Sequence, residues 1–440
     1  MKFISKIKDK HLQDIVKGGS INFLFYALNI VVVYLLSIFI SKIYGPEVYG
    51  RFAIIKSLIL ILIIFSTLGL NTLAIKLSSN EKYFNDGTFK SDFLVKSYAI
   101  IIITTVLISI LILFNRQLFA SNVFKDNLLE DYFYLFPIIL ISAVLLNYNS
   151  NLFKGQGRVI LFSVISSFLP NIILLTALYL IYKFSNQGEF YIVLCLALSY
   201  LFVLILSFFY VFPLKWDNVV TKVKAKSLLL RSYPMMISAS MIYLIFSVDT
   251  IMLGMLETSE NVGIYRIVSQ VSSVISVFII VLGTVVGPKI SKLYANNEIS
   301  EFKKLIQNSS KILFYISFPL LILILIFAYQ ILGFFGTSYQ KGHTSLIILS
   351  VCQFLFVVTG FVDIILNMTG HQKIFGKITI FTAALNITLN LIFIPKYGIN
   401  GAAMATGFSI VLNNLIGLFY IKKKLNVITL YLPLQKSKSP

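Results

Sequence analysis

The chain has 440 residues, of which 58% are hydrophobic and only 12% are charged, so it is far more apolar than soluble globular proteins. In a soluble protein its net charge of +20 would suggest a nucleic-acid partner, but here the basic residues stand between long apolar runs, which excludes that interpretation. The two cysteines, Cys195 and Cys352, both lie inside apolar runs, so the sequence predicts neither a disulfide framework nor a metal site.

Residues 1–17 predict a short amphipathic helix that lies on the cytoplasmic surface of the membrane. Phe3, Ile7 and Leu12 fall near one helical face with lysines opposite, which suits a negatively charged leaflet. A frayed basic tail is the alternative. The apolar run that follows is too long for a cleavable signal peptide, and no small-residue cleavage site ends it.

Twelve apolar segments follow, and each is long enough to cross a bilayer as a helix. About 20 residues at a rise of about 1.5 Å span a hydrocarbon core of about 30 Å. The predicted spans lie near 20–41, 52–75, 97–114, 132–153, 159–182, 190–212, 233–256, 264–286, 312–335, 344–368, 374–394 and 399–421.

These spans predict an all-α integral membrane protein built from two lobes. The expected divisions are an interfacial helix over 1–17, an N-terminal six-helix lobe over 18–214, a basic cytoplasmic linker over 215–232, a C-terminal six-helix lobe over 233–421 and a basic cytoplasmic tail over 422–440.

The loop charges predict the orientation. Most of the 37 Lys and Arg residues fall on the side of the membrane that also holds both termini. The other side holds Lys42, Arg51, Arg116, Lys125, Lys183, Arg266, Lys341 and Lys396. Because cytoplasmic loops carry the excess of basic residues, both termini are predicted to be cytoplasmic in a multi-pass plasma-membrane protein.

The two halves also repeat in sequence. One constant shift places Gly50 over Gly263 and Ala53 over Arg266, and a closely similar shift places Gly155 over Gly370. The second shift also places Asn171-Ile172 over Asn386-Ile387. Since six spans is an even number, the two repeats have the same orientation, and a transporter of this plan holds its substrate between them.

Three basic residues are candidates for a substrate-binding wall. Lys56 lies roughly 9 Å inside span 2, and Arg266 enters span 8 from the same side. The repeat places Arg266 over Ala53, which is one helical turn from Lys56, so both cations are expected to line one central space and to attract a diphosphate. Arg51 either extends this lining or is a solvated charge at the rim, and we favour the rim.

Two carboxylates inside spans are candidates for ion coupling or ion pairing. Asp249 lies about 10 Å below the outer surface, where it either pairs with Arg266 or exchanges a proton or sodium ion. Asp363 lies nearer the cytoplasmic end of span 10, where it can do the same or pair with Lys373 or Lys377. No cofactor is predicted beyond a possible coupling to an H⁺ or Na⁺ gradient.

Several sequence blocks, in order, resemble polysaccharide repeat-unit flippases, the Wzx-type members of the multidrug/oligosaccharidyl-lipid/polysaccharide exporter superfamily. They are ISKIYGPEVYGRFAIIKSL near the start, Pro234 and Asp249 followed by ENVGIYR and GPKIS, and IPKYGINGAAMATG near the end. The resemblance implies a twelve-helix transporter that moves an undecaprenyl-diphosphate-linked oligosaccharide between leaflets for O-antigen or capsule synthesis. It also implies contact with membrane lipids and suggests a polysaccharide polymerase and a chain-length regulator as partners.

Related flippases line their cavity with basic residues on spans 1, 2 and 8. This chain matches that pattern with Lys56 and Arg266, but span 1 carries no charge between Ser20 and Ser41, which argues against the lipid II flippase itself.

Two other functions fit the sequence less well. A multidrug or cation antiporter of the same superfamily usually relies on acidic groups in the first lobe, whereas here the buried charge of that lobe is Lys56, which would repel a cation. A polymerase or acyltransferase would need a long outer loop with catalytic groups, but the longest one, Asn115–Asp131, is short and has no histidine. The sequence therefore favours a flippase over a cation antiporter and predicts that the chain is not an enzyme.

Overall fold

The computed structural model describes residues 10–80, 84–85, 88–184, 188–211, 215–221, 223–427 and 429–430, and of these 10–23, 84–91, 215–221 and 237–246 as backbone only. The predicted interfacial helix begins, and the predicted basic tail ends, outside the described residues. From Lys10 the backbone is already helical and continues without interruption into the first span.

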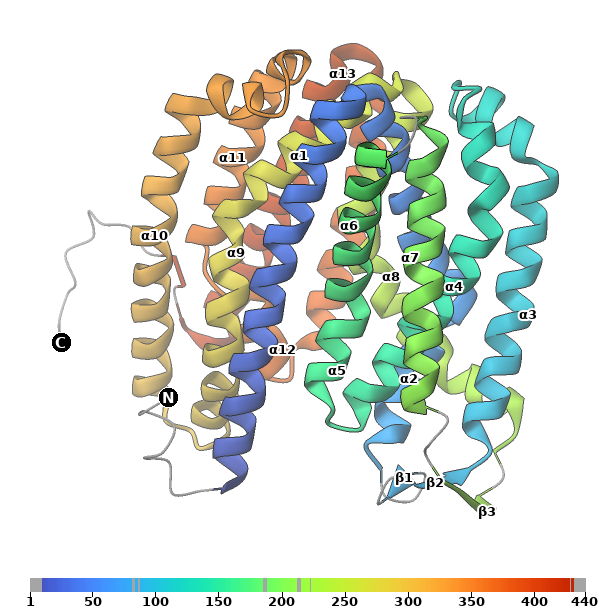
Figure 1. Cartoon of the computed structure of the whole chain (residues 1–440). Coiled ribbons are helices and arrows are strands. Elements are labelled where there is room, and N and C mark those ends of the chain that lie inside the picture. The colour runs from blue at the N-terminus through green and yellow to red at the C-terminus, as the bar shows by residue number, and fades with distance from the viewer. Residues whose placement is uncertain are drawn as a thin grey trace. The chain divides into compact units, whose positions relative to one another are not determined.

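The first half of the chain consists of helices joined by short loops (Figure 1). Its helices are α1 (Lys10–Thr67), α2 (Leu70–Ser78), α3 (Phe93–Phe114), η2 (Leu118–Val123), α4 (Leu129–Gly155), α5 (Val159–Ser163), η3 (Val164–Phe168), α6 (Leu169–Phe184) and α7 (Phe190–Val211). Helices α5, η3 and α6 follow one another directly and together form a single crossing.

The second half repeats this pattern with longer helices. They are α8 (Ala225–Leu256), α9 (Ser259–Ala295), α10 (Ile299–Gly333), η4 (Thr337–Gly342), α11 (His343–Val358), α12 (Val362–Met368) and α13 (Gln372–Leu425). Helices α9 and α10 extend past the predicted spans 264–286 and 312–335, because the polar residues that follow one span and precede the next are helical as well.

The helices of the described chain account for the twelve predicted crossings. Nine segments are long and apolar enough to cross a membrane. Two of them, α1 and α13, each contain two crossings, since their backbones bend sharply at Gly45 (φ 84°) and Gly398 (φ 56°). Positive φ is costly for residues with a Cβ, so glycine suits both bends. Helix α8 is the remaining crossing, and the predicted fold of a twelve-helix membrane protein is confirmed.

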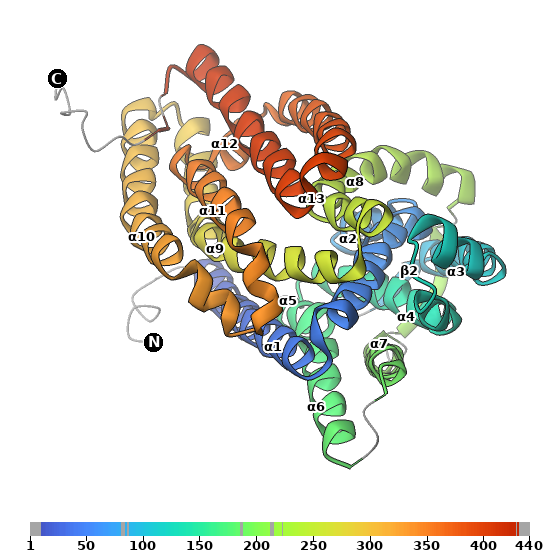
Figure 2. The ribbon, with the colours of Figure 1, turned by 90° about the horizontal axis from the view of Figure 1, so that it is seen from above.

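The chain divides into two compact units. The first contains residues 1–44 and 54–243, and the second contains residues 45–53 and 244–440. In the second unit α9, α10 and α11 pack against one another (Figure 2). Large side chains such as Tyr265, Phe302, Tyr339 and Phe361 are fully buried in that unit.

Two glycines make a reciprocal backbone contact inside the second unit. A Cβ on Gly50 would lie 1.8 Å from the carbonyl oxygen of Ser259, and a Cβ on Gly263 would lie 2.0 Å from that of Pro46. The sequence repeat that aligns Gly50 with Gly263 also aligns Pro46 with Ser259, so the contact has approximate two-fold symmetry. Close approach of membrane helices through small residues is a common way to pack them without a hydrophobic driving force.

A small sheet joins the loop before α3 to the segment before α8, and the sequence analysis did not anticipate it. Strand β1 (Phe84–Asn85) pairs antiparallel with β2 (Thr88–Ser91), and β2 pairs parallel with β3 (Lys215–Thr221). Beside it Asp92 accepts a 2.8 Å hydrogen bond from the backbone N–H of Val223 and lies 2.5 Å from the Lys96 ammonium. Part of the predicted linker is therefore attached to the first unit.

Candidate functional site

Lys56 lies in the second arm of α1 and belongs to the first unit. Its ammonium donates a 3.1 Å hydrogen bond to Asn171 Oδ1 on α6, and the amide of Asn171 donates a 3.0 Å bond to Asn29 Oδ1 on the first arm of α1. The side chains of all three residues are half-buried. The two amides hold Lys56 in place between three helical segments, a role that the sequence analysis did not assign to them.

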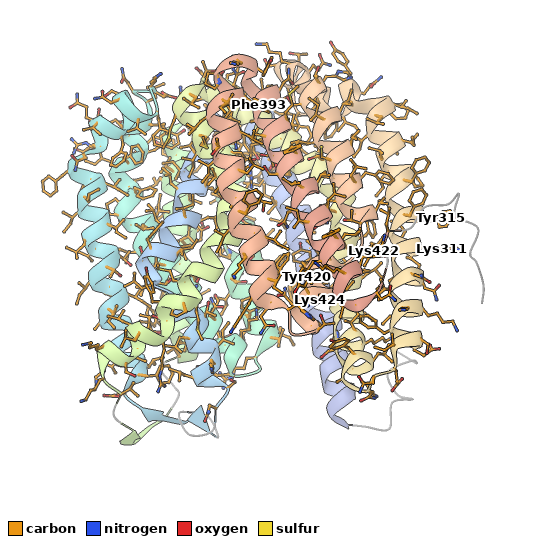
Figure 3. The ribbon with its side chains drawn as sticks, turned by 180° about the vertical axis from the view of Figure 1, so that it is seen from behind. Lys311, Tyr315, Phe393, Tyr420, Lys422 and Lys424 are labelled. Atoms are coloured by element: carbon orange, nitrogen blue, oxygen red, sulfur yellow. The ribbon has the colours of Figure 1, made fainter. Side chains whose placement is uncertain are left out.

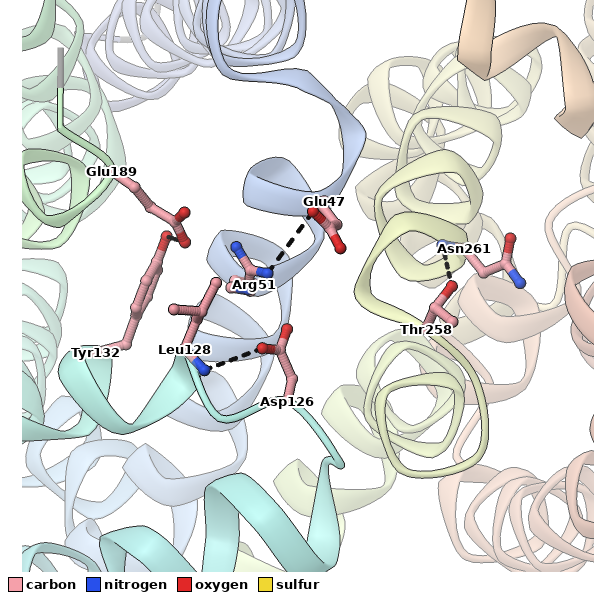
Figure 4. A network of polar contacts seen from close by, with 8 residues as sticks. All are labelled: Glu47, Arg51, Asp126, Leu128, Tyr132, Glu189, Thr258 and Asn261. Atoms are coloured by element: carbon pink, nitrogen blue, oxygen red, sulfur yellow. Dashed lines mark hydrogen bonds and ion pairs between the residues drawn. The ribbon is translucent and has the colours of Figure 1, made fainter.

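Arg266 lies in the second turn of α9, in the second unit. The helix begins cleanly because the Thr258 side chain accepts a hydrogen bond from the backbone N–H of Asn261 (Figure 4). Arg266 is half-buried, and its guanidinium makes no hydrogen bond or ion pair with any residue that the structure describes. Its five N–H donors are therefore available to a ligand or to water. Since Lys56 belongs to the other unit, the common basic wall stays a prediction.

Arg51 is not the solvated rim charge that we favoured from the sequence. It is only 3% exposed, and its guanidinium lies 3.8 Å from the carboxylate of Glu47, one helical turn earlier (Figure 4). The sharp bend at Gly45 turns this part of α1 into the second unit, where packing covers Arg51. The sequence could not show this, because Arg51 stands at the very start of the predicted span.

Asp249 is a buried carboxylate of the second unit, and its hydrogen-bond partners are neutral. Its Oδ2 accepts a 2.6 Å hydrogen bond from the Tyr265 hydroxyl and a 3.3 Å bond from Thr406 Oγ1, and its Oδ1 accepts one from the backbone N–H of Thr250. Among the described residues no ion pair joins Asp249 to Arg266. The charge of Arg266 nevertheless acts electrostatically on Asp249, so both predicted roles of Asp249, pairing with Arg266 and exchange of a proton or sodium ion, stay predictions.

Two asparagines extend this polar group along α13. Asn386 Nδ2 lies 3.4 Å from Thr406 Oγ1, and Asn390 Nδ2 donates a 3.1 Å bond to Asn386 Oδ1. The Asn390 Oδ1 atom is buried and has no partner in the described structure. The cluster thus presents carboxylate, hydroxyl and amide oxygens inside a membrane-spanning unit, a donor set that suits a proton or a hard cation such as Na⁺.

The sequence contained two signals for residues of this cluster. Asn386 aligns by the internal repeat with Asn171, the partner of Lys56, and Thr406 stands in the block GINGAAMATG. Neither Asn386 nor Thr406 was predicted as a site residue from the sequence, because neutral polar residues are common in membrane helices.

Asp363 is half-buried in the first turn of α12. It forms no ion pair with Lys373 or Lys377 in the part of the chain that the structure describes. A carboxylate in the first turn of a helix is favoured by the helix dipole, which gives Asp363 a structural role without a basic partner.

Comparison with known proteins finds two family models and several relatives that resemble the chain. The family model described as "Polysaccharide biosynthesis protein" matches residues 15–294, and the MatE model matches residues 234–392. The probable low-salt glycan biosynthesis flippase Agl15 of Haloferax volcanii is 27% identical over 183 residues, which is 41% of this chain and 38% of that protein. The capsular polysaccharide biosynthesis protein CapF of Staphylococcus aureus is 28% identical over 268 residues, which is 59% of this chain and 67% of that protein.

Solved structures share the fold at low sequence identity. The lipid II flippase MurJ in an inward closed conformation aligns with a TM-score of 0.74 and 15% identity, over 92% of this chain and 87% of that one. An inward-facing multidrug resistance MATE transporter of the MOP superfamily also aligns with a TM-score of 0.74, at 17% identity, over 91% of this chain and 94% of that one.

Proposed function

The chain belongs to the polysaccharide biosynthesis protein family, and on that basis we propose that it is a lipid-linked oligosaccharide flippase. It moves undecaprenyl-diphosphate-linked repeat units from the cytoplasmic to the outer leaflet of the bacterial plasma membrane by alternating access, for surface polysaccharide synthesis. Its termini are cytoplasmic. A polysaccharide polymerase and a chain-length regulator are the partners that such a product would meet.

The observation that supports this proposal most is the state of Arg266. A half-buried guanidinium within a membrane helix costs several kcal/mol unless it meets an anion or water. Arg266 interacts electrostatically with Asp249, but among the described residues no carboxylate lies within ion-pair distance of its guanidinium and none accepts a hydrogen bond from it. A diphosphate would supply both, because guanidinium and phosphate form charge-assisted, often bidentate hydrogen bonds.

The need for a protein follows from the substrate. Sugar hydroxyl groups lose their hydrogen bonds to water when they enter hydrocarbon, and each loss costs several kcal/mol. An oligosaccharide therefore crosses the bilayer only inside a polar passage, which a two-unit membrane protein can provide.

Deletion of the gene tests the proposal directly. We expect lipid-linked oligosaccharide to accumulate on the cytoplasmic leaflet, where it stays protected from an impermeant glycosidase added to intact cells, and surface glycan to disappear. Normal surface glycan in a clean deletion, with no second flippase present, would refute the assignment.

A multidrug or cation antiporter is the alternative, and the match of the MatE model to residues 234–392 favours it. The two functions differ in the charge that they must bind. If the protein were a cation antiporter, it would confer resistance to cationic drugs, and its deletion would leave the surface glycan intact.

Ion coupling belongs to the same proposal. Asp249 carries the coupling proton or sodium ion, because its hydrogen-bond partners are neutral hydroxyl and amide groups, and Arg266 acts on it only electrostatically, without an ion pair in the described structure. Asp363 is the second candidate for this role.

A further inference from the structure

The C-terminal half of α4 is buried except at two asparagines. Every residue from 142 to 153 is buried apart from Asn147 and Asn151, which are half-buried and lie one helical turn apart on the same face. Asn147 lies roughly 12 Å from the end of α4, which is well inside the membrane span. A third half-buried asparagine, Asn71, faces them from α2, and we call these three residues the amide cluster.

The amide cluster is held together by its own hydrogen bonds. Asn71 Nδ2 donates to Asn147 Oδ1 at 3.1 Å. Asn151 Nδ2 donates to the same oxygen at 3.2 Å and to the backbone carbonyl of Asn147 at 2.8 Å. Asn71 Oδ1 accepts the backbone N–H of Thr72 at 2.8 Å. The three side chains are thus fixed in orientation before any ligand arrives.

Two polar atoms of the cluster remain available. Asn147 Nδ2 donates to no described residue, and Asn151 Oδ1 accepts from none. Asn149, on another face of the same helix, shows the contrast, because it is fully buried and is satisfied by the Tyr98 hydroxyl and by Ser207 Oγ. Asn149 therefore ties α3, α4 and α7 together, whereas the amide cluster keeps unused hydrogen-bonding capacity.

Close packing at the end of α4 sets the position of α2. A Cβ on Gly155 would lie 2.6 Å from the carbonyl oxygen of Ile75 and 2.9 Å from the Ser78 side chain, so only glycine allows this approach. Ile75 is one helical turn from Asn71, as Asn151 is from Gly155. The glycine contact therefore holds the two helices in the register that brings Asn71 to Asn147.

The chemistry of the amide cluster identifies what it would bind. Amides with unused donors and acceptors are costly against hydrocarbon, so Asn147 Nδ2 and Asn151 Oδ1 require water or a polar ligand as a partner. A neutral amide offers a donor and an acceptor side by side, which matches a sugar hydroxyl, and it has no charge with which to attract a diphosphate.

We propose that Asn71, Asn147 and Asn151 form a subsite for hydroxyl groups of the transported oligosaccharide. This inference rests on the proposed flippase function and assigns the sugar to residues of the first unit other than the basic residues that would bind the diphosphate.

Binding of two probes to the purified full-length protein in nanodiscs tests the subsite. The first probe is the lipid-linked oligosaccharide extracted from a strain that lacks this protein, and the second is undecaprenyl diphosphate without sugar. We expect Asn147→Leu and Asn151→Leu each to weaken binding of the first probe about tenfold, as the loss of one or two hydrogen bonds would. Binding of the second probe should not change.

Asn122→Leu is the matched control, since Asn122 is an exposed asparagine outside the cluster, and it should alter neither affinity. A thermal unfolding curve of each variant shows whether it is folded. If one of Asn147→Leu and Asn151→Leu does not fold, the other still tests the subsite. Unchanged binding of the oligosaccharide probe, or an equal loss for both probes, would overturn the subsite and leave the flippase proposal standing. If the wild-type protein bound neither probe, the flippase proposal would fail, and the subsite with it.

Discussion

Arg51, Asp249 and Arg266 all lie in helices of the second unit, and each has a different kind of neighbour. Arg51 is paired with Glu47, Asp249 accepts hydrogen bonds from hydroxyl groups, and Arg266 acts electrostatically on Asp249 but forms no ion pair or hydrogen bond with a described residue. A paired charge is structurally satisfied, whereas an unpaired one within the membrane marks a place where a ligand acts. On this criterion Arg266 is the stronger substrate-binding candidate and Arg51 the weaker.

The first prediction concerns the basic residues Lys56 and Arg266. Lys56→Glu or Arg266→Glu should abolish glycan export, because each change turns attraction for a diphosphate into repulsion where screening is weaker than in bulk water. Lys56→Arg should be largely tolerated, since the charge and the donors to Asn171 remain. Surface glycan is measured in a deletion strain that carries each variant, with membrane levels of the protein as control. Full export by Lys56→Glu protein at a normal level would contradict the proposed site.

The second prediction concerns the carboxylate of Asp249. Asp249→Asn should remove the dependence of transport on the coupling ion and reduce the rate by at least about tenfold, because the neutral amide cannot exchange a proton or hold Na⁺ by charge. Transport into proteoliposomes with and without an imposed H⁺ or Na⁺ gradient measures this. A variant that still responded to the gradient as the wild type does would exclude Asp249 as the coupling group.

A double variant separates ion coupling from ion pairing. If Arg266 served only to neutralise Asp249, the combination of Arg266→Ala with Asp249→Ala would restore what either single change loses. Because Asp249 bonds to Tyr265 and Thr406 and forms no ion pair with Arg266 in the described structure, we expect no such rescue.

At the scale of elements, the short arm of α1 from Gly45 to Ala53 is anchored to α9 by the Gly50–Gly263 contact. The second arm of α1 begins after the bend at Gly45, and α9 begins after the Thr258 cap. The contact therefore sets the position of the first turns of this arm and of α9. Arg51 and Arg266 lie in or next to these turns, so the contact also helps to position their backbones.

Gly263→Ala tests this contact. Alanine normally favours a helix over glycine, but here its Cβ would lie 2.0 Å from the Pro46 carbonyl oxygen. We expect destabilisation of about 1–3 kcal/mol, the usual cost of overpacking, seen as a lower thermal unfolding midpoint in detergent. Gly376→Ala is the matched control, because no heavy atom lies within 4 Å of a Cβ there. Equal midpoints for the two variants would show that the contact is not tight in solution.

At the scale of the whole molecule, the distribution of basic residues predicts which side faces the cytoplasm. Helix α13 has Lys422, Lys423 and Lys424 in its last turn, and Figure 3 shows Lys311, Lys422 and Lys424 all at a lower level of the second unit than Phe393. Phe393 lies just before the bend at Gly398, which the loop charges assign to the outer side.

Single cysteines check the orientation. In a background where Cys195 and Cys352 are replaced by alanine, Asn122→Cys and Asn261→Cys should react with an impermeant thiol reagent added to intact cells. Ser227→Cys should react only after the membrane is permeabilised, because the charge asymmetry places it on the cytoplasmic side. Labelling of Ser227→Cys in intact cells would reverse the topology.

The sequence by itself determined the number of crossings and the identity of the charged candidates. Both are local properties, since a bilayer of about 30 Å requires about 20 apolar residues for each crossing, and a charge within such a run is conspicuous. The sequence repeat was visible for the same reason, because Gly50 and Gly263 stand at corresponding places in two similar segments.

Only the tertiary structure decided which partners those charges have. The burial of Arg51, the hydroxyl groups around Asp249 and the amides around Asn147 all depend on which helix face meets which neighbour. The residues that meet there, Asn71 and Asn147 or Asp249 and Thr406, are far apart in the chain. Neutral polar side chains are common in membrane helices, where they form hydrogen bonds between helices, so their partners become visible only once the helices are packed.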